Sequence, residues 1–406
     1  MVKKPNRIPV LLAACICTGM GGYLLTWSYF RDSLGQLFPT WTSSQLSLPF
    51  SLHNITVCVM MLTTGQILHK LSNRVVICIG GFALMIGFGL FPLLPLGSPG
   101  AALVMVTISF GFIAALSVGI GIIASFDTFL PWFPDRTGMV SGILTFFSGV
   151  APMMIGALCG VFIRNFGVLR AVQLTGVVLA ALIFIALIWA KQPGPDVVLP
   201  APPPADAKIF TDVDYTPAEM LKTGTFWCMF AFNVLLRTTG IIVFDLGGTI
   251  AVAFGAATIV GLMFAPLNGA ACILGGIILD RLGTHKVMLI FSVSAALGAG
   301  ALFIGNQAGA AALVIAGIAL IGFAYGGVTV TCVSGNRMLF GMKHYAKNLG
   351  LISVSIGPAA VAAMIAGRLI RERNSFTGVF TLIMVLTVAS VASCCLMFAT
   401  ERKRRS

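Results

Sequence analysis

The sequence is poor in charge. Only 9% of its 406 residues are charged and 12 are acidic, whereas 58% are hydrophobic. In a typical water-soluble domain about a quarter of the residues are charged and under half are apolar. This composition therefore excludes an ordinary soluble globule and indicates a chain that folds in lipid.

The sequence also lacks the groups on which most enzymes depend. It shows no nucleotide-binding loop, no nucleophile triad and no cluster of metal-ligating side chains. All ten cysteines fall inside apolar runs without metal-ligand spacing to histidine, so we interpret them as small packing residues. No soluble nucleotide domain is present to drive an ATP-dependent pump. We therefore expect no enzymatic activity, no cofactor and no bound metal.

Long apolar runs are abundant instead. A membrane-spanning helix needs roughly 20 mostly apolar residues. The first run is long enough to cross the membrane, so we expect it to be retained and not cleaved as a secretory signal. The sequence predicts an all-α integral membrane protein with about twelve transmembrane helices, at 8–30, 46–68, 75–94, 101–131, 138–163, 168–190, 224–252, 256–279, 286–305, 309–336, 347–369 and 375–399.

The basic residues are distributed unevenly between alternate loops. With both termini in the cytoplasm, 18 Lys and Arg lie on the cytoplasmic side, six lie outside and Arg237 lies within a span. Basic loops resist translocation, so this bias predicts the orientation in a bacterial cytoplasmic membrane. The net charge of +13 then reflects topology and contact with anionic lipids, and we expect no binding to nucleic acid.

A proline-rich segment separates two similar halves. Residues 191–223 contain seven prolines and are expected to form a cytoplasmic linker between six-helix bundles at 1–190 and 224–406. A basic turn begins at Gly65 after the second span, and a similar turn begins at Gly276 after the eighth. Two parallel six-helix repeats resemble the architecture of the major facilitator superfamily, and this resemblance implies a substrate site near the midplane between the halves.

The second of these turns resembles the loop signature of the major facilitator superfamily, G-x-x-x-D-R-x-G-x-[RK]. Asp280 can cap or pair across the bundle and Arg281 can hold the cytoplasmic face, so we expect both to act in gating. In the first turn His69 stands where the signature has an acid, and Ser72 replaces its glycine. We therefore expect the N-terminal latch to be altered.

Further motifs recur in order along the chain: Trp27-Ser-Tyr-Phe30, Trp41–Phe50, Trp132–Gly142, Thr216–Thr223, Tyr325–Gly327 and Asn348–Gly350. Together they resemble one branch of that superfamily, the oxalate/formate antiporter family, which is related to monocarboxylate transporters. The resemblance implies exchange or symport of small organic anions. The oxalate-exchanging branch carries basic residues in helices 8 and 11, where this chain has Cys272 and a position near Ile356. Oxalate is therefore not the expected substrate.

Arg237 is the basic residue that we expect deepest in the membrane. It lies 13 residues beyond Gly224, roughly 20 Å along a helix at 1.5 Å per residue. An ionisable group at that depth is costly and usually functional. Because a guanidinium offers two parallel donors to a carboxylate, we predict that Arg237 binds the anion, with a structural ion pair as the alternative.

Four further residues are predicted to line the substrate cavity. They are Tyr23, Trp27, Tyr325 and Asn268. Hydroxyl, indole and amide groups can orient a small anion, whereas packing or a place in the interfacial belt also explains the aromatic residues.

Three more residues are candidates for coupling or gating. Asp245, eight residues after Arg237, could take up a proton or pair with that arginine. Asp127 could gate the inner mouth or cap a broken helix end. His53 could sense protons between about pH 5 and 8, or be hydrogen-bonded as part of the packing.

These features leave two hypotheses for the function. The first is a secondary active transporter, an antiporter or proton symporter, that moves a small carboxylate other than oxalate by alternating access. Its expected partners are the anion, a proton or counter-anion, and membrane lipids, and we expect a monomer. The second is a transporter-like protein or sensor that binds a neutral or cationic solute through Asp127 and Asp245.

Overall fold

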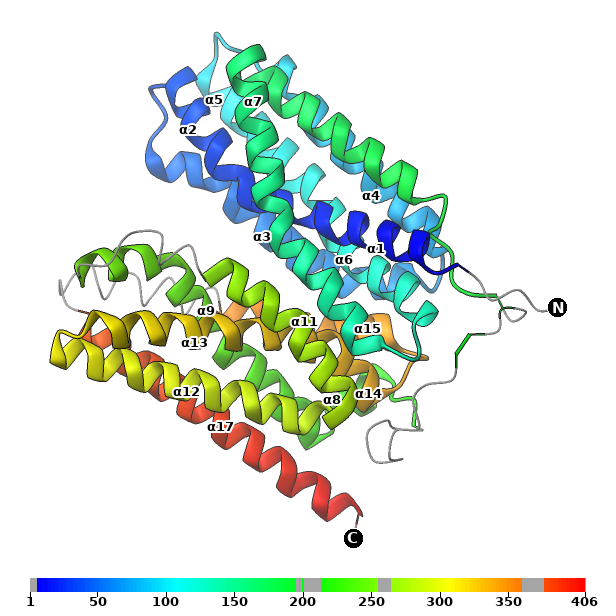
Figure 1. The fold of residues 1–406 in the computed structure, drawn as a ribbon. Coiled ribbons are helices and arrows are strands. Elements are labelled where there is room, and N and C mark those ends of the chain that lie inside the picture. Colours follow the sequence, from blue (N-terminus) through cyan, green and yellow to red (C-terminus); the bar gives the residue numbers. More distant parts are fainter. Residues whose placement is uncertain are drawn as a thin grey trace. The chain divides into compact units, whose positions relative to one another are not determined.

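The computed structural model describes residues 6–194, 197, 199–200, 213–254, 264–359 and 376–405. Within these ranges every regular element is a helix (Figure 1). The contacts divide the chain into two compact units, Met1–Pro134 with Phe147–Ala201 and Asp135–Phe146 with Pro202–Ser406. The second unit thus includes the first turns of a helix whose remainder belongs to the first.

The first unit is a bundle in which α1, α3 and α4 pack against α6. Its elements are α1 Ile8–Met20, η1 Gly21–Thr26, α2 Trp27–Leu37, α3 Ser43–Ile67, α4 Asn73–Gly89, η2 Phe91–Leu93, α5 Pro99–Ile108, η3 Ser109–Ala114, α6 Ala115–Phe129, η4 Leu130–Trp132 and most of α7 Thr137–Ala186. Gly167 interrupts α7 with φ 74° and ψ 164°. Glycine adopts a positive φ without the steric cost of a side chain, so the predicted spans 138–163 and 168–190 meet at this break.

The second unit packs α12 against α13 and α17, α17 against α9, and α11 against α13 (Figure 1). Its elements are α8 Pro217–Leu221, α9 Gly224–Ala253, α11 Phe264–Leu282, α12 Thr284–Ala308, α13 Ala311–Val330, η5 Thr331–Gly335, α14 Asn336–Phe340, α15 Tyr345–Ser353 and α17 Thr377–Arg405. The start of α7 also lies in this unit and crosses α11, where Gly138 and Gly276 meet backbone to backbone. A side chain at either glycine would collide with the opposite helix.

Two of the described segments are π-helical, and they lie at equivalent places in the two halves. They are η3, between α5 and α6, and η5, after α13. A π-helical turn is rare and frequently marks a functional site, because it displaces the regular backbone hydrogen bonds. Both segments contact the candidate residues considered below.

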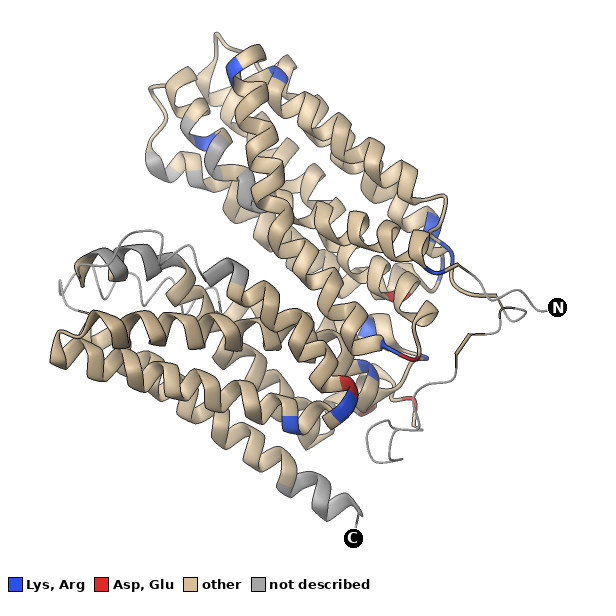
Figure 2. Ribbon diagram, viewed as in Figure 1, with Lys and Arg blue, Asp and Glu red and all other residues tan. Residues whose placement is uncertain are grey.

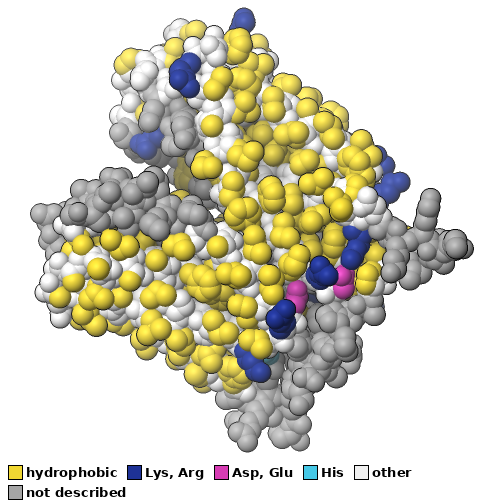
Figure 3. All heavy atoms as spheres, viewed as in Figure 1, with side chains coloured by type: hydrophobic (Ala, Val, Ile, Leu, Met, Phe, Trp, Pro, Cys, Tyr) yellow, Lys and Arg dark blue, Asp and Glu magenta, His cyan; other side chains and the backbone are white. Residues whose placement is uncertain are grey.

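The helices carry the hydrophobic outer surface that a bilayer requires. Among the described residues, eight helices are long and apolar enough to cross a membrane, and α1 is a shorter apolar helix. Gly167 divides the longest of the eight, and the predicted spans 256–279 and 347–369 include residues outside the described ranges. Figure 2 shows charged residues mainly at helix ends and in connections. Figure 3 shows hydrophobic side chains over the visible faces.

Candidate functional site

The candidate site in the second unit is built around Arg237 of α9. The side chain is 8% exposed, although it lies on a helix made mostly of apolar residues. Within the described part of the chain its Nε has no hydrogen-bond partner. A buried charged donor normally finds an acceptor, since leaving it unpaired carries the full cost of its desolvation. This nitrogen therefore has capacity for a ligand.

Two neutral side chains lie beside the guanidinium. Arg237 interacts electrostatically with Tyr325 of α13 and with the thiol of Cys332 in η5. Cys332 also contacts Ser353, the last residue of α15. The Tyr325 ring approaches α9 closely because Gly240, one helical turn beyond Arg237, has no side chain to displace it. Three helical segments thus place polar but uncharged groups around one buried cation, and we call these four residues, Arg237, Tyr325, Cys332 and Ser353, the Arg237 cluster.

The eighth predicted helix, α11, borders this cluster through Asn268 and Cys272. The Cys272 thiol donates to the Gly326 carbonyl at 3.5 Å and lies 4.0 Å from Asn268 Oδ1. Cys272 also interacts electrostatically with Tyr325. Of the five residues that the sequence predicts for substrate binding, the structure therefore places Tyr325 beside Arg237, and Asn268 is linked to this pair through Cys272.

Two residues near Arg237 remain to be placed. Asp245 is in α9, but its side chain lies outside the described residues. Asn233 is fully buried four residues before Arg237, and its Nδ2 donates to the Met229 carbonyl at 2.8 Å. Its Oδ1 has no partner among the described residues. Because residues four apart share a helix face, the spacing of Asn233 from Arg237 is a sequence signal that places both on one side of α9.

Tyr23, Trp27 and His53 form a separate group in the first unit. Their rings surround Phe110 of η3, with Trp27 at 4.4 Å and His53 at 4.9 Å between centroids. Tyr23 OH donates to the Ala114 carbonyl, and His53 Nδ1 lies 3.0 Å from the Phe110 carbonyl. All three side chains are buried, and His53 Nε2 has no partner in the described part. These residues hold the π-helical segment, and their roles in binding or coupling stay predictions.

Asp127 lies near the end of α6, where several segments of the first unit meet. Its Oδ2 accepts a hydrogen bond from Asn73 Nδ2 at 2.8 Å and from Gln192 Nε2 at 3.2 Å. His69 lies near enough to interact with it electrostatically. Asp127 thus joins the start of α4 to the residues that follow α7. The predicted gating role is compatible with this position and remains to be tested.

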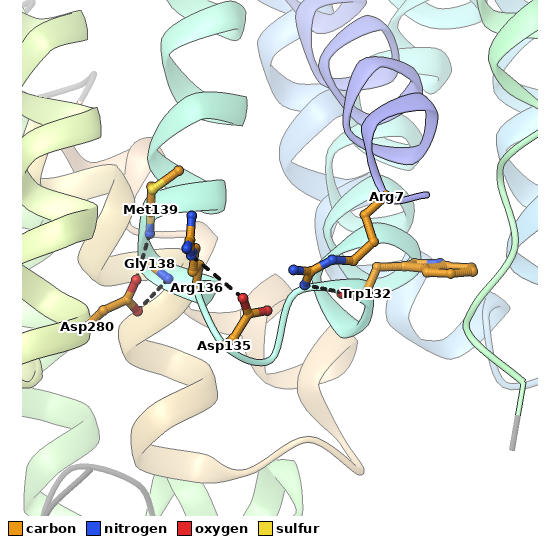
Figure 4. Close-up of polar contacts among 7 residues, drawn as sticks. All are labelled: Arg7, Trp132, Asp135, Arg136, Gly138, Met139 and Asp280. Carbon is orange, nitrogen blue, oxygen red and sulfur yellow. Dashed lines mark hydrogen bonds and ion pairs between the residues drawn. The ribbon is translucent and has the colours of Figure 1, made fainter. Parts of the chain in front are cut away.

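Asp280 makes the contacts of a helix cap. Its carboxylate accepts hydrogen bonds from the N–H groups of Gly138 at 2.7 Å and Met139 at 2.9 Å, in the first turn of α7 (Figure 4). The positive end of the helix dipole favours a carboxylate at this place. Arg337 lies near Asp280 and donates to Thr137 Oγ1 at 2.9 Å. Arg281 is exposed.

Comparisons with known proteins agree with this architecture. The model of the Major Facilitator Superfamily matches residues 9–334. The uncharacterized MFS-type transporter YhjX of Escherichia coli (strain K12) is 23% identical over 348 residues, which cover 84% of this chain and 82% of that protein. The oxalate:formate antiporter of Oxalobacter formigenes is 23% identical over 364 residues, which cover 87% and 82%.

Solved structures show the same fold. The fucose:proton symporter FucP of E. coli has a TM-score of 0.68 at 13% identity, with 97% of this chain and 99% of that chain covered. A bacterial homologue of the iron transporter ferroportin in an outward-facing state has a TM-score of 0.73 at 12% identity, with 97% and 100% covered. These findings confirm the predicted all-α membrane fold and the resemblance to this group of transporters. The family model covers most of the sequence, and the chain belongs to the major facilitator superfamily.

Proposed function

We propose that this protein is a secondary active transporter, an antiporter or proton symporter, of a small carboxylate other than oxalate. The observation that carries the proposal is the Nε of Arg237, a buried donor without a partner among the described residues. The similarity to an oxalate:formate antiporter supports an anionic substrate. Transport proceeds by alternating access of the bundles at 1–190 and 224–406.

The chemistry of the Arg237 cluster favours a substrate with one carboxylate over a substrate with two. A carboxylate can accept from Nε and one terminal nitrogen of the same guanidinium edge, which gives a bidentate pair. Tyr325 and Asn268 supply neutral polar groups nearby, and Cys272 supplies no charge. A dianion would bring a second carboxylate into a site whose described groups offer it no second cation. Monoanions are therefore favoured over oxalate.

The remaining candidates take supporting roles in this proposal. Asp245 and His53 are candidates for proton coupling, and Asp280, with Arg281, for gating. Tyr23 and Trp27 are candidates for lining the substrate cavity from the first bundle. The contacts of Asp127 with Asn73 and Gln192 support a structural or gating role more than solute binding. The transporter acts as a monomer in the bacterial cytoplasmic membrane, with both termini and the linker in the cytoplasm.

The test measures uptake of radiolabelled formate, acetate, lactate and oxalate into proteoliposomes that contain the purified protein. We expect Arg237→Gln to abolish uptake of whichever monoanion the wild type transports, because loss of one member of a buried charge pair costs about 2–5 kcal/mol. Arg237→Lys should restore uptake partly, since an ammonium lacks the planar fork of donors. Arg170→Gln is the matched control because Arg170 is exposed in the first unit.

Three outcomes would contradict parts of the proposal. A well-folded Arg237→Gln protein with undiminished anion uptake would remove this residue from the site. Misfolding of Arg237→Gln, with expression and uptake both restored by Asp245→Asn, would show instead that the arginine forms a structural pair. Robust oxalate exchange by the wild type would show that our interpretation of Cys272 and Ile356 is wrong.

A further inference from the structure

Two residues near the end of the linker are bound to the turn that precedes α15. Asp214 Oδ1 accepts hydrogen bonds from the N–H groups of Met342 at 2.8 Å and Lys343 at 3.0 Å. The next residue, Tyr215, donates its backbone N–H to the Phe340 carbonyl at 3.0 Å. Two consecutive linker residues thus bond to three residues of one turn.

Two further contacts close this attachment. Asn348 Nδ2, in the first turns of α15, donates to the Tyr215 carbonyl at 2.9 Å. The Tyr215 ring is 9% exposed and packs edge-on against Phe340, with 5.9 Å between centroids. Gly341 has a φ of 82°, and a side chain there would collide with Asp214. The turn is therefore shaped to receive the linker.

The start of α7 is held in a comparable way by a carboxylate from another segment. There the acceptor is Asp280, which receives two consecutive N–H groups from Gly138 and Met139. Asp280 belongs to the second copy of the repeated turn, and the first copy has His69 at the equivalent position. The first copy therefore has no carboxylate equivalent to Asp280. At the start of α15 the carboxylate comes from the linker instead, as Asp214.

Backbone hydrogen bonds and nearby positive charges keep the Asp214 carboxylate ionised. Hydrogen bonding from the Lys343 backbone is the main cause that lowers the pKa of Asp214, and the nearby Lys343 and His344 side chains lower it further. Glu219 also lies close to His344, and Lys222 lies beside it. The Asp214 carboxylate is therefore ionised, and can accept both hydrogen bonds, near neutral pH.

The helix that begins at this attachment leads to the Arg237 cluster. Ser353, which contacts Cys332, lies eight residues after Tyr345, about 12 Å along α15. When the first turn of a short helix is held in place, the position of its last residue is held as well. The position of Ser353 thus depends on what the linker does at the other end of α15.

We propose that Asp214 and Tyr215 form a strap, supplied by the linker, that fixes the start of α15 and so positions Ser353 against Cys332 within the Arg237 cluster. The strap couples the linker mechanically to the candidate binding residues of the second unit. It requires no assumption about which anion is transported.

Hydrogen–deuterium exchange of the full-length protein in nanodiscs tests the strap. In Asp214→Ala we expect the amides of residues 342–350 to exchange about tenfold faster than in the wild type, because two hydrogen bonds to a charged acceptor are lost. Asp214→Asn keeps an oxygen acceptor without the charge and should lie between the two. Glu219→Gln is the matched control, since that carboxylate accepts from Thr216 N at 2.9 Å and caps α8. It should leave residues 342–350 unchanged.

Labelling by N-ethylmaleimide, followed by peptide mass spectrometry, tests the link to the cluster. Asp214→Ala should accelerate modification of Cys332, whereas buried Cys159 in the first unit should react as in the wild type. Unchanged exchange at residues 342–350 in Asp214→Ala and Asp214→Asn would overturn the strap. Faster exchange without faster Cys332 labelling would overturn its coupling to the Arg237 cluster.

Discussion

Two carboxylates near the end of the linker accept hydrogen bonds from backbone N–H groups. Asp214 is bonded to the turn before α15, and Glu219 caps α8 through the N–H of Thr216. In each case the bond from a backbone N–H is the main cause that lowers the pKa of the carboxyl group. A lowered pKa in the folded protein means that the ionised form favours folding.

This argument predicts how the contribution of Asp214 to stability changes with pH. The contribution is fully present above the pKa of an unfolded aspartate, about 3.9, and is lost as the pH falls through the lower folded value. The difference in Tm between the wild type and Asp214→Asn should therefore be present at about pH 5 and above and shrink below about pH 4. Differential scanning fluorimetry in detergent measures it. A difference that does not shrink below about pH 4 would contradict the assignment.

Arg237 illustrates what a sequence reveals at the scale of single residues. A charge inside an apolar run stands out, so its importance could be predicted without a structure. Cys332 and Ser353 could not be found in this way, because a cysteine and a serine in apolar helices resemble packing residues. They become candidates only when folding places them together beside a guanidinium. Contacts between residues that are far apart in the sequence cannot be recognised from the sequence alone.

At the scale of elements, η3 depends on side chains from neighbouring segments. Thr56 Oγ1 donates to the Gly111 carbonyl at 3.0 Å and also contacts the Leu52 carbonyl of its own helix. Together with His53 and Tyr23 it supplies donors to three carbonyls of the π-helical segment. Hydrophobic periodicity carries no signal for such a segment, because π and α turns expose the same apolar residues. The spans could be predicted from the sequence, but not these irregularities within them.

The hydrogen bond from Thr56 should contribute measurably to stability. Thr56→Val keeps the shape of the side chain but leaves the buried Gly111 carbonyl without this donor, at a cost of about 1–3 kcal/mol. Thr63→Val is the matched control, since Thr63 lies in the same helix and bonds its own Val59 carbonyl at 3.0 Å. Thermal unfolding in detergent compares the two variants. Equal stability would show that the donor from α3 is dispensable for η3.

At the scale of the whole molecule, apolar runs and the repeated turn were enough to predict the fold. The runs predicted helices, and the turns after Gly65 and Gly276 predicted two related halves; the family comparison confirms this fold. The grouping of Asp135–Phe146 with the second unit could not be predicted, because it depends on close contacts such as that of Gly138 with Gly276. A glycine in an apolar run does not reveal which helix it will meet.

The orientation of the molecule in the membrane is the final prediction. Since 18 basic residues lie on one side of the predicted topology and six on the other, the linker should face the cytoplasm. A cysteine introduced by Ala205→Cys should react with an impermeant maleimide only after the cells are permeabilised. Ser98→Cys, in the exposed connection between α4 and α5, is the control and should react in intact cells. Labelling of the native cysteines in the described helices is the background, and it is measured with the unsubstituted protein. If Ala205→Cys but not Ser98→Cys reacts from outside intact cells, the predicted orientation is wrong. The strap and the Asp280 contact would then lie on the outer side of the membrane.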